Sequence, residues 1–145
     1  MPAAQVVLDS HALLKLLRDE PGAEMVSQLL EKAGQRDQPV HMTEVNYAEV
    51  QYIVRMKGGD AAWATIAKEL KAAPIEFHPA DRRLADLAAD FKARFKLSLA
   101  DAFAAALAKD RKTELVTGDP WAADPGCYLL DEEITGQPVG GESEI

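Results

Sequence analysis

One stretch constrains the fold of this chain more than any other: residues 97–120, LSLADAFAAALAKDRKTELVTGDP. Residues 102–108 carry no polar side chain, so the spacing predicts a helix that is buried on nearly all sides. Its broad apolar face consists of Leu99, Ala102, Phe103, Ala106 and Leu107. A short apolar strand, residues 115–117, and a Gly-Asp-Pro turn follow. We therefore expect this helix to lie in the middle of the molecule.

Two carboxylates border the segment. Asp101 stands at the head of the helix, on the face that also holds small alanines, and Asp119 follows the strand. A carboxylate in such a place is either a helix cap or a ligand. Both carboxylates could have a purely structural role. Ser98, three residues before Asp101, gives a capping-box pattern, and Asp119 lies in a Gly-Asp-Pro sequence that is common in turns. Only the rest of the chain can decide between the two.

Length and charge limit the possibilities. The 145 residues fit one domain, which we assign to residues 1–131, and residues 132–145 lose periodicity and read as a flexible tail. Sixteen basic against 24 acidic residues give a net charge of −8. Proteins that track a phosphate backbone are usually basic, so an acidic protein that handles nucleic acid would need metal ions at the contact.

The compartment is predicted from two features. A single cysteine, Cys127, excludes an internal disulfide and fits a reducing cytosol. The first ten residues lack the basic start of a signal peptide, and no window approaches the roughly 18 apolar residues of a membrane-spanning helix. We expect a cytoplasmic protein without a membrane segment.

Short apolar strands alternate with helices along the chain. Strands are expected at residues 5–8, 40–42, 74–77, 115–117 and 128–130, and helices at residues 11–18, 23–33, 44–56, 61–72, 81–95 and in the segment above. Ser10 and Thr43 are candidate helix caps, and Gly58-Gly59 separates two of the helices. This alternation predicts an α/β layer fold with a parallel sheet.

In such sheets, ligands bind beyond the carboxyl ends of the strands. Asp9 and Asp119 follow strands, while Glu49 and Asp101 lie near the starts of helices that begin on the same rim. Gathered carboxylates repel one another unless a cation lies between them, and oxygen ligands suit Mg²⁺ or Mn²⁺. Such an ion typically acts on phosphates.

The sequence lacks the motifs of several other kinds of catalytic or cofactor-binding site. The three histidines, His11, His41 and His78, are scattered, so we expect structural histidines and no zinc site. There is no phosphate-binding P-loop, no nucleophile elbow and no dinucleotide fingerprint.

Four segments together resemble a known family. VVLDSHALLKLL, TEVNYAEV, LSLADAFAAALA and LVTGDP are similar to the four motifs of PIN-domain ribonucleases, above all the VapC toxins of toxin–antitoxin pairs. The resemblance runs from Val6 to about Leu130. It maps the acids of the family onto Asp9, Glu49, Asp101 and Asp119, and its supporting polar residues onto Ser10, Asn46 and Thr117. Whether Asp124 joins the site is left open.

The resemblance implies a three-layer PIN-like fold, with a five-stranded parallel sheet flanked by helices. It also implies cleavage of RNA with Mg²⁺ or Mn²⁺, a homodimer, and a cognate antitoxin that lays a segment, often with an arginine, into the acidic groove. The net charge of −8 agrees with attraction of a cationic segment.

The predicted function is therefore a metal-dependent endoribonuclease toxin. Two alternatives stay open: a PIN nuclease of RNA processing without an antitoxin, and a PIN-like module that binds RNA or protein without cutting. A phosphoacceptor signalling domain is disfavoured, because the chain lacks a close acid pair near the N-terminus and a lysine after a late strand.

Overall fold

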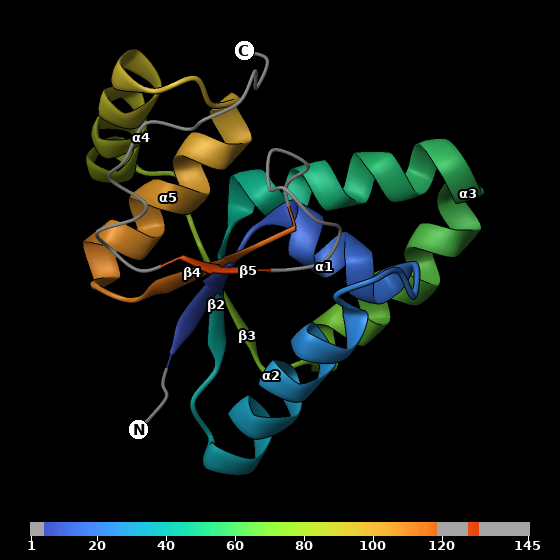
Figure 1. The fold of residues 1–145 in the computed structure, drawn as a ribbon. Helices are drawn as coiled ribbons and strands as arrows, with labels where there is room; N and C mark the ends of the chain where they lie inside the picture. Colours follow the sequence, from blue (N-terminus) through green and yellow to red (C-terminus); the bar gives the residue numbers. More distant parts are fainter. Residues whose placement is uncertain (1–4, 119–127, 131–145) are drawn as a thin grey trace.

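A computed structural model describes residues 5–118 and 128–130 and has the expected α/β class, a sheet between layers of helices (Figure 1). The elements follow one another along the chain as β1 (Val6–Leu8), α1 (Ser10–Leu17), α2 (Ala23–Arg36), β2 (Val40–Thr43), α3 (Glu44–Ala72), β3 (Ile75–His78), α4 (Arg82–Arg94), α5 (Leu99–Arg111), β4 (Glu114–Thr117) and β5 (Tyr128–Leu130). The expected tail, residues 132–145, lies outside the described residues. None of the helices in the described ranges is both long and apolar enough to cross a membrane.

The sheet has five strands in the order β3-β2-β1-β4-β5. The pairs β1–β2, β1–β4 and β2–β3 are parallel, whereas β5 runs antiparallel to β4. The expectation of an all-parallel sheet is therefore wrong for the last strand. The reason is the short connection: a parallel neighbour needs a crossover of about a dozen residues or more, usually a helix, and only residues 118–127 separate the two strands.

Two cores cover the two faces of the sheet. Val7 and Leu115 belong to the core under α4 and α5, while Val6, Leu8 and Val116 belong to the core under α1, α2 and α3. Figure 1 shows this arrangement, with α4 and α5 on one side of the strands and α1 and α2 on the other.

Helix α5 lies where its sequence predicts. All residues from Ala102 to Ala108 are buried, so the all-apolar run is confirmed as the centre of the α4–α5 core. Leu99 is an exception to the predicted apolar face, because 54% of its surface is exposed. It is the first residue of α5 and precedes the packed run.

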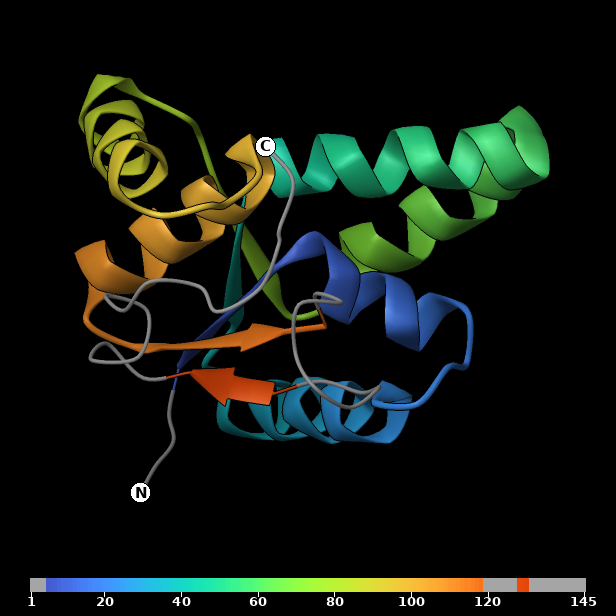
Figure 2. The same ribbon diagram turned by 45° about the horizontal axis from the view of Figure 1, so that its top comes forward.

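Helix α3 is a helical hairpin. Its backbone breaks at Gly59, where φ is +85° and ψ is 176°, and the second half returns toward the sheet (Figures 1 and 2). Tyr47 of the first half packs edge-on against Trp63 of the second, with ring centroids 5.6 Å apart, and against Phe77 of β3 at 5.1 Å. The two predicted helices and the glycine break between them are confirmed.

Candidate functional site

Three helices begin beside the carboxyl ends of the parallel strands, and each has a side-chain cap. The caps of α1, α3 and α5 are Asp9, Thr43 and Ser98. Their side chains accept hydrogen bonds from the backbone N–H groups of Ala12, Asn46 and Asp101. The positive ends of these helix dipoles favour negative charge close by. Thr43 and Ser98 match the sequence patterns, but Ser10 as the cap of α1 is wrong: Asp9 takes that place, and Ser10 is the first helical residue.

Asp9 is held firmly at the end of β1. Its side chain is buried, and Oδ1 accepts hydrogen bonds from the N–H groups of Ala12 at 2.8 Å and Gly118 at 3.3 Å. The hydroxyl of Thr117, at the end of β4, donates to Oδ2. Burial raises the pKa of Asp9, and these hydrogen bonds oppose the rise. The carboxylate is thus fixed in orientation and costly to ionise without a cation.

A side chain at Gly118 would crowd the backbone of α1. A Cβ at this position would lie 3.0 Å from the carbonyl carbon and oxygen of His11 and 3.1 Å from the backbone nitrogen of Ala12. The end of β4 therefore approaches the first turn of α1 closely enough to donate the Gly118 N–H to Asp9.

Ser10, Asn46 and Glu49 form a hydrogen-bond network between α1, α3 and α5. The Ser10 hydroxyl donates to Oε1 of Glu49 and accepts from Nδ2 of Asn46 at 3.3 Å. The same amide donates to the carbonyl of Ala100, next to Asp101, at 3.2 Å. Thr43 donates its hydroxyl to Oδ1 of Asn46 at 2.6 Å. The predicted shared side of Asn46 and Glu49 is confirmed.

The predicted acids differ in their environments. Asp9 and Asp101 are buried and Glu49 is half-buried, while Asp119 and Asp124 lie outside the described residues. Among the described residues, Asp9, Glu49 and Asp101 do not belong to a group of three side chains whose possible ligand atoms lie within 4.8 Å of one another. Hydrogen bonds connect their sequence neighbours: Glu49 accepts from Ser10, next to Asp9, and Asn46 donates to the carbonyl of Ala100, next to Asp101. Their oxygen donors fit a hard ion such as Mg²⁺ or Mn²⁺.

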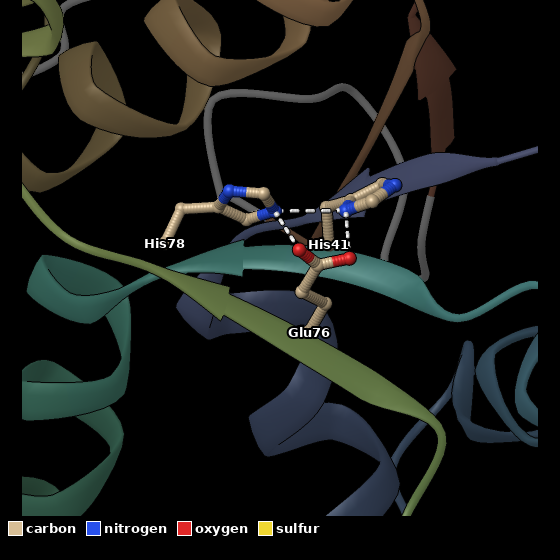
Figure 3. A group of neighbouring side chains, drawn as sticks. All are labelled: His41, Glu76 and His78. Atoms are coloured by element: carbon tan, nitrogen blue, oxygen red, sulfur yellow. Dashed lines mark hydrogen bonds and ion pairs between the residues drawn. The ribbon is translucent and has the colours of Figure 1, made fainter.

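The group that does have metal-ligand spacing is His41, Glu76 and His78 (Figure 3). The expectation of scattered histidines without a metal-binding set is therefore wrong for two of the three. The register explains it: His41 of β2 pairs with Glu76 of β3, and His78 is two residues further along β3, so all three lie on one face of the sheet. The Glu-x-His alternation of residues 76–78 was the signal in the sequence.

Both histidines of this group are neutral at physiological pH. Burial lowers the pKa of His41 to about 4, with smaller contributions from the charges of Arg111 and His78, and Glu76 opposes the shift. Burial also lowers the pKa of His78. Neutral imidazoles keep a nitrogen lone pair for a hydrogen bond or a metal.

Comparisons with known proteins agree with this fold. Residues 6–123 match the sequence model of the PIN domain. No curated protein sequence matches the chain. Among solved structures, a toxin–antitoxin complex from Klebsiella pneumoniae is 20% identical, with a TM-score of 0.61, over 84% of this chain and 94% of that one.

Two further structures are similar. VapBC2 from Rickettsia felis, bound to a DNA fragment from the promoter, is 15% identical with a TM-score of 0.65, over 80% of this chain and 88% of that one. DNA-bound VapBC from Salmonella typhimurium is 12% identical with a TM-score of 0.61, over 80% of this chain and 87% of that one. Because the sequence identities are only 12–20%, these structures show a similar fold and no more.

Proposed function

This chain belongs to the PIN-domain family, and on that premise we propose that it is a metal-dependent endoribonuclease toxin controlled by a cognate antitoxin. The observation that carries the proposal is the buried carboxylate of Asp9. It is oriented by Thr117 and Gly118, and hydrogen bonds connect Ser10, its neighbour, to Glu49 and Asn46 to the backbone beside Asp101. A purely structural cap would not need to be buried beside further acids, because capping works as well at the surface.

Asp9, Glu49, Asp101 and Asp119 would hold one or two Mg²⁺ or Mn²⁺ ions. The bound metal would supply an activated water and neutralise charge that develops on the phosphoryl group. The burial of Asp9 supports this role, since ionisation of a desolvated carboxylate is favoured by a cation beside it.

Ser10, Asn46 and Thr117 act as positioning residues in this proposal. Thr117 fixes one oxygen of Asp9, and Asn46 holds the hydroxyl of Ser10, which in turn holds Glu49. The hydroxyls of Ser10 and Thr117 would also help to orient the attacking water.

An antitoxin partner is supported by the kind of structure that this fold resembles, because the similar solved structures are toxin–antitoxin and VapBC complexes. A net charge of −8 favours a cationic inhibitor segment at the acidic rim. The same charge disfavours long contacts with RNA, so we expect a locally structured RNA target, a homodimer in solution, and action in the cytoplasm.

The test is RNA cleavage by purified protein that is stripped of metal with EDTA and then given Mg²⁺ or Mn²⁺. Cleavage should return with the metal. The Asp101→Asn variant should be slower by about 100-fold or more, because several kcal/mol of charge stabilisation depend on the metal. Asp86→Asn, at an exposed acid of α4, is the matched control and should cleave like the wild type.

Three results would contradict all or part of the proposal. Equal cleavage rates for Asp101→Asn and the wild type would show that Asp101 does not belong to the catalytic metal site. A wild-type protein that binds RNA but cuts none with either metal would favour the non-catalytic module. Cleavage without any neighbouring antitoxin reading frame would favour the processing nuclease.

A further inference from the structure

The side chains of His41, Glu76 and His78 face one another across two adjacent strands (Figure 3). Nδ1 of His41 lies 2.9 Å from Nε2 of His78. The Glu76 carboxylate reaches both rings, with Oε1 at 3.8 Å from Nδ1 of His41 and Oε2 at 3.9 Å from Nε2 of His78. In a tetrahedral site with metal–ligand bonds of about 2.0–2.1 Å, donor atoms are about 3.3 Å apart. A shift of roughly half an ångström per side chain would thus reach ligand spacing.

The backbone holds this arrangement. His41 and Glu76 are register partners, and the β2–β3 pairing continues to Thr43 and His78. His41 is 1% exposed on the interior strand β2, whereas the side chain of Glu76 is 53% exposed on the edge strand β3 and can move toward the two histidines. The strand pairing therefore fixes the positions of His41 and His78, while the exposed side chain of Glu76 can adjust.

A hydrogen bond on the far side of His41 orients its ring. Nε2 of His41 lies 3.1 Å from Oε1 of Gln5, and with the Gln5 amide in this orientation a proton on Nε2 completes the hydrogen bond. In that tautomer the lone pair of Nδ1 points to Nε2 of His78, 2.9 Å away. A partner that fixes the non-ligating nitrogen in this way is typical of metal-binding histidines. Neutral His78 needs only to move its proton to Nδ1 to offer Nε2 as a ligand.

The charges around the group are mixed. Glu76 supplies a negative charge in direct contact. Arg111, at the end of α5, lies near enough to oppose a positive charge on both histidines, and Asp110 partly offsets it at His78. Arg111 is thus the group that would weaken a bound cation.

We propose that His41, Glu76 and His78 form a binding site for a borderline divalent transition metal ion, with Zn²⁺ as the reference ion, through two imidazole nitrogens and one carboxylate oxygen. Imidazole ligands select such ions over Mg²⁺. The site takes no ligand from the acidic rim, so it is independent of the proposed nuclease activity. A bound ion cross-links edge strand β3 to β2 and stabilises the fold by mass action.

The test is a calorimetric titration of the chelator-treated full chain with Zn²⁺, in a Cys127→Ser background that removes the thiol. One equivalent should bind, and the midpoint of thermal unfolding should rise with Zn²⁺ concentration. Glu76→Gln, at an exposed position, should weaken binding by about tenfold, and His78→Gln by about 100-fold. Arg111→Gln should strengthen it.

His11→Gln is the matched control, because it removes a histidine but leaves the group intact, and it should bind Zn²⁺ like the parent protein. The proposal is overturned if the parent shows no saturable binding at micromolar Zn²⁺. It is also overturned if His78→Gln and Glu76→Gln bind as tightly as the parent, or if Asp9→Asn abolishes binding that His78→Gln retains. Since no RNA is present, the result is separate from the test of nuclease activity.

Discussion

Asp9 is a helix cap in the structure, and in our proposal it is also a metal ligand. It caps α1 through the N–H of Ala12, and its second oxygen accepts from Thr117. A residue can be both a cap and a ligand, because a carboxylate has about four lone-pair positions. Because of the cap, we expect Asp9→Ala to lower stability.

We predict that Asp9→Asn and Asp9→Ala separate the two roles. Asparagine is as good a cap as aspartate, so Asp9→Asn should lose RNA cleavage and keep its free energy of unfolding at pH 7 within about 1 kcal/mol. Asp9→Ala should lose cleavage and also about 1–3 kcal/mol, because buried N–H donors lose their acceptor. Urea unfolding and cleavage assays measure both. If Asp9→Asn cleaves RNA like the wild type, Asp9 is a helix cap and not a metal ligand.

The wild type and Asp9→Asn should also differ in how the free energy of unfolding depends on pH. The folded-state pKa of Asp9 is raised above its ordinary value of 3.8, so its contribution to stability is present below pH 3.8 and is lost as the pH rises through the raised pKa. Asp9→Asn should lack this loss. Added Mg²⁺ or Mn²⁺ should reduce the loss in the wild type only.

His41 gives a prediction of the opposite sign. Its pKa falls from 6.5 to about 4 on folding, so between these values the unfolded state binds a proton that the folded state does not. The free energy of unfolding should therefore decrease as the pH is lowered from 6.5 to 4, by up to about 3 kcal/mol from this group. Urea unfolding across that range should show a smaller decrease for His41→Gln. Equal slopes in both proteins would contradict the assignment.

At the scale of elements, the turn of α3 depends on a backbone that only glycine adopts easily. Gly59 has a φ of +85° with no atom within 4 Å of a Cβ position, so the constraint there is the backbone and not space. The turn brings Trp63 back to Tyr47 and delivers β3 to the sheet edge.

We predict that Gly59→Ala lowers the free energy of unfolding by about 1 kcal/mol, because alanine disfavours positive φ. Gly34→Ala in α2 is the matched control of opposite sign. Its Cβ would meet only Pro74 Cγ, at 3.8 Å, in a helix where alanine is preferred, and stability should rise by about 0.5–1 kcal/mol. Denaturant midpoints compare the two, and a stabilising Gly59→Ala would refute the interpretation of the break.

The elements also show what a sequence can and cannot predict. The caps Thr43 and Ser98, the break at Gly58-Gly59 and the buried run of α5 are local, and local patterns predicted them. The direction of β5 depends on the length of a connection, and the His41–His78 contact depends on the pairing of two strands. Leu99 was misassigned because periodicity does not tell where packing begins.

At the scale of the whole molecule, parallel strands and helix starts gather distant residues at one rim. Topology alone predicted that Asp9, Glu49, Asp101 and Asp119 converge, whereas Ser10, Asn46 and Thr117 came from the family resemblance. The hydrogen bonds of Thr117 to Asp9 and of Ser10 to Glu49 agree with that prediction for the described residues, and Asp119 lies outside them. Topology did not predict the distances between the carboxylates. The described carboxylates are not preassembled at the spacing of a single shared ion, so in the proposed site they would move closer together while Ser10 keeps its hydrogen bond to Oε1 of Glu49.

The most direct test is a crystal of the protein soaked with Mn²⁺, measured for anomalous scattering near the manganese edge. The account predicts a peak between the carboxylates of Asp9 and Asp101, with Glu49 and Asp119 within reach of it. Ordered, unchanged Asp9, Glu49 and Asp101 side chains without a peak between them, at a Mn²⁺ concentration that supports RNA cleavage, would contradict it.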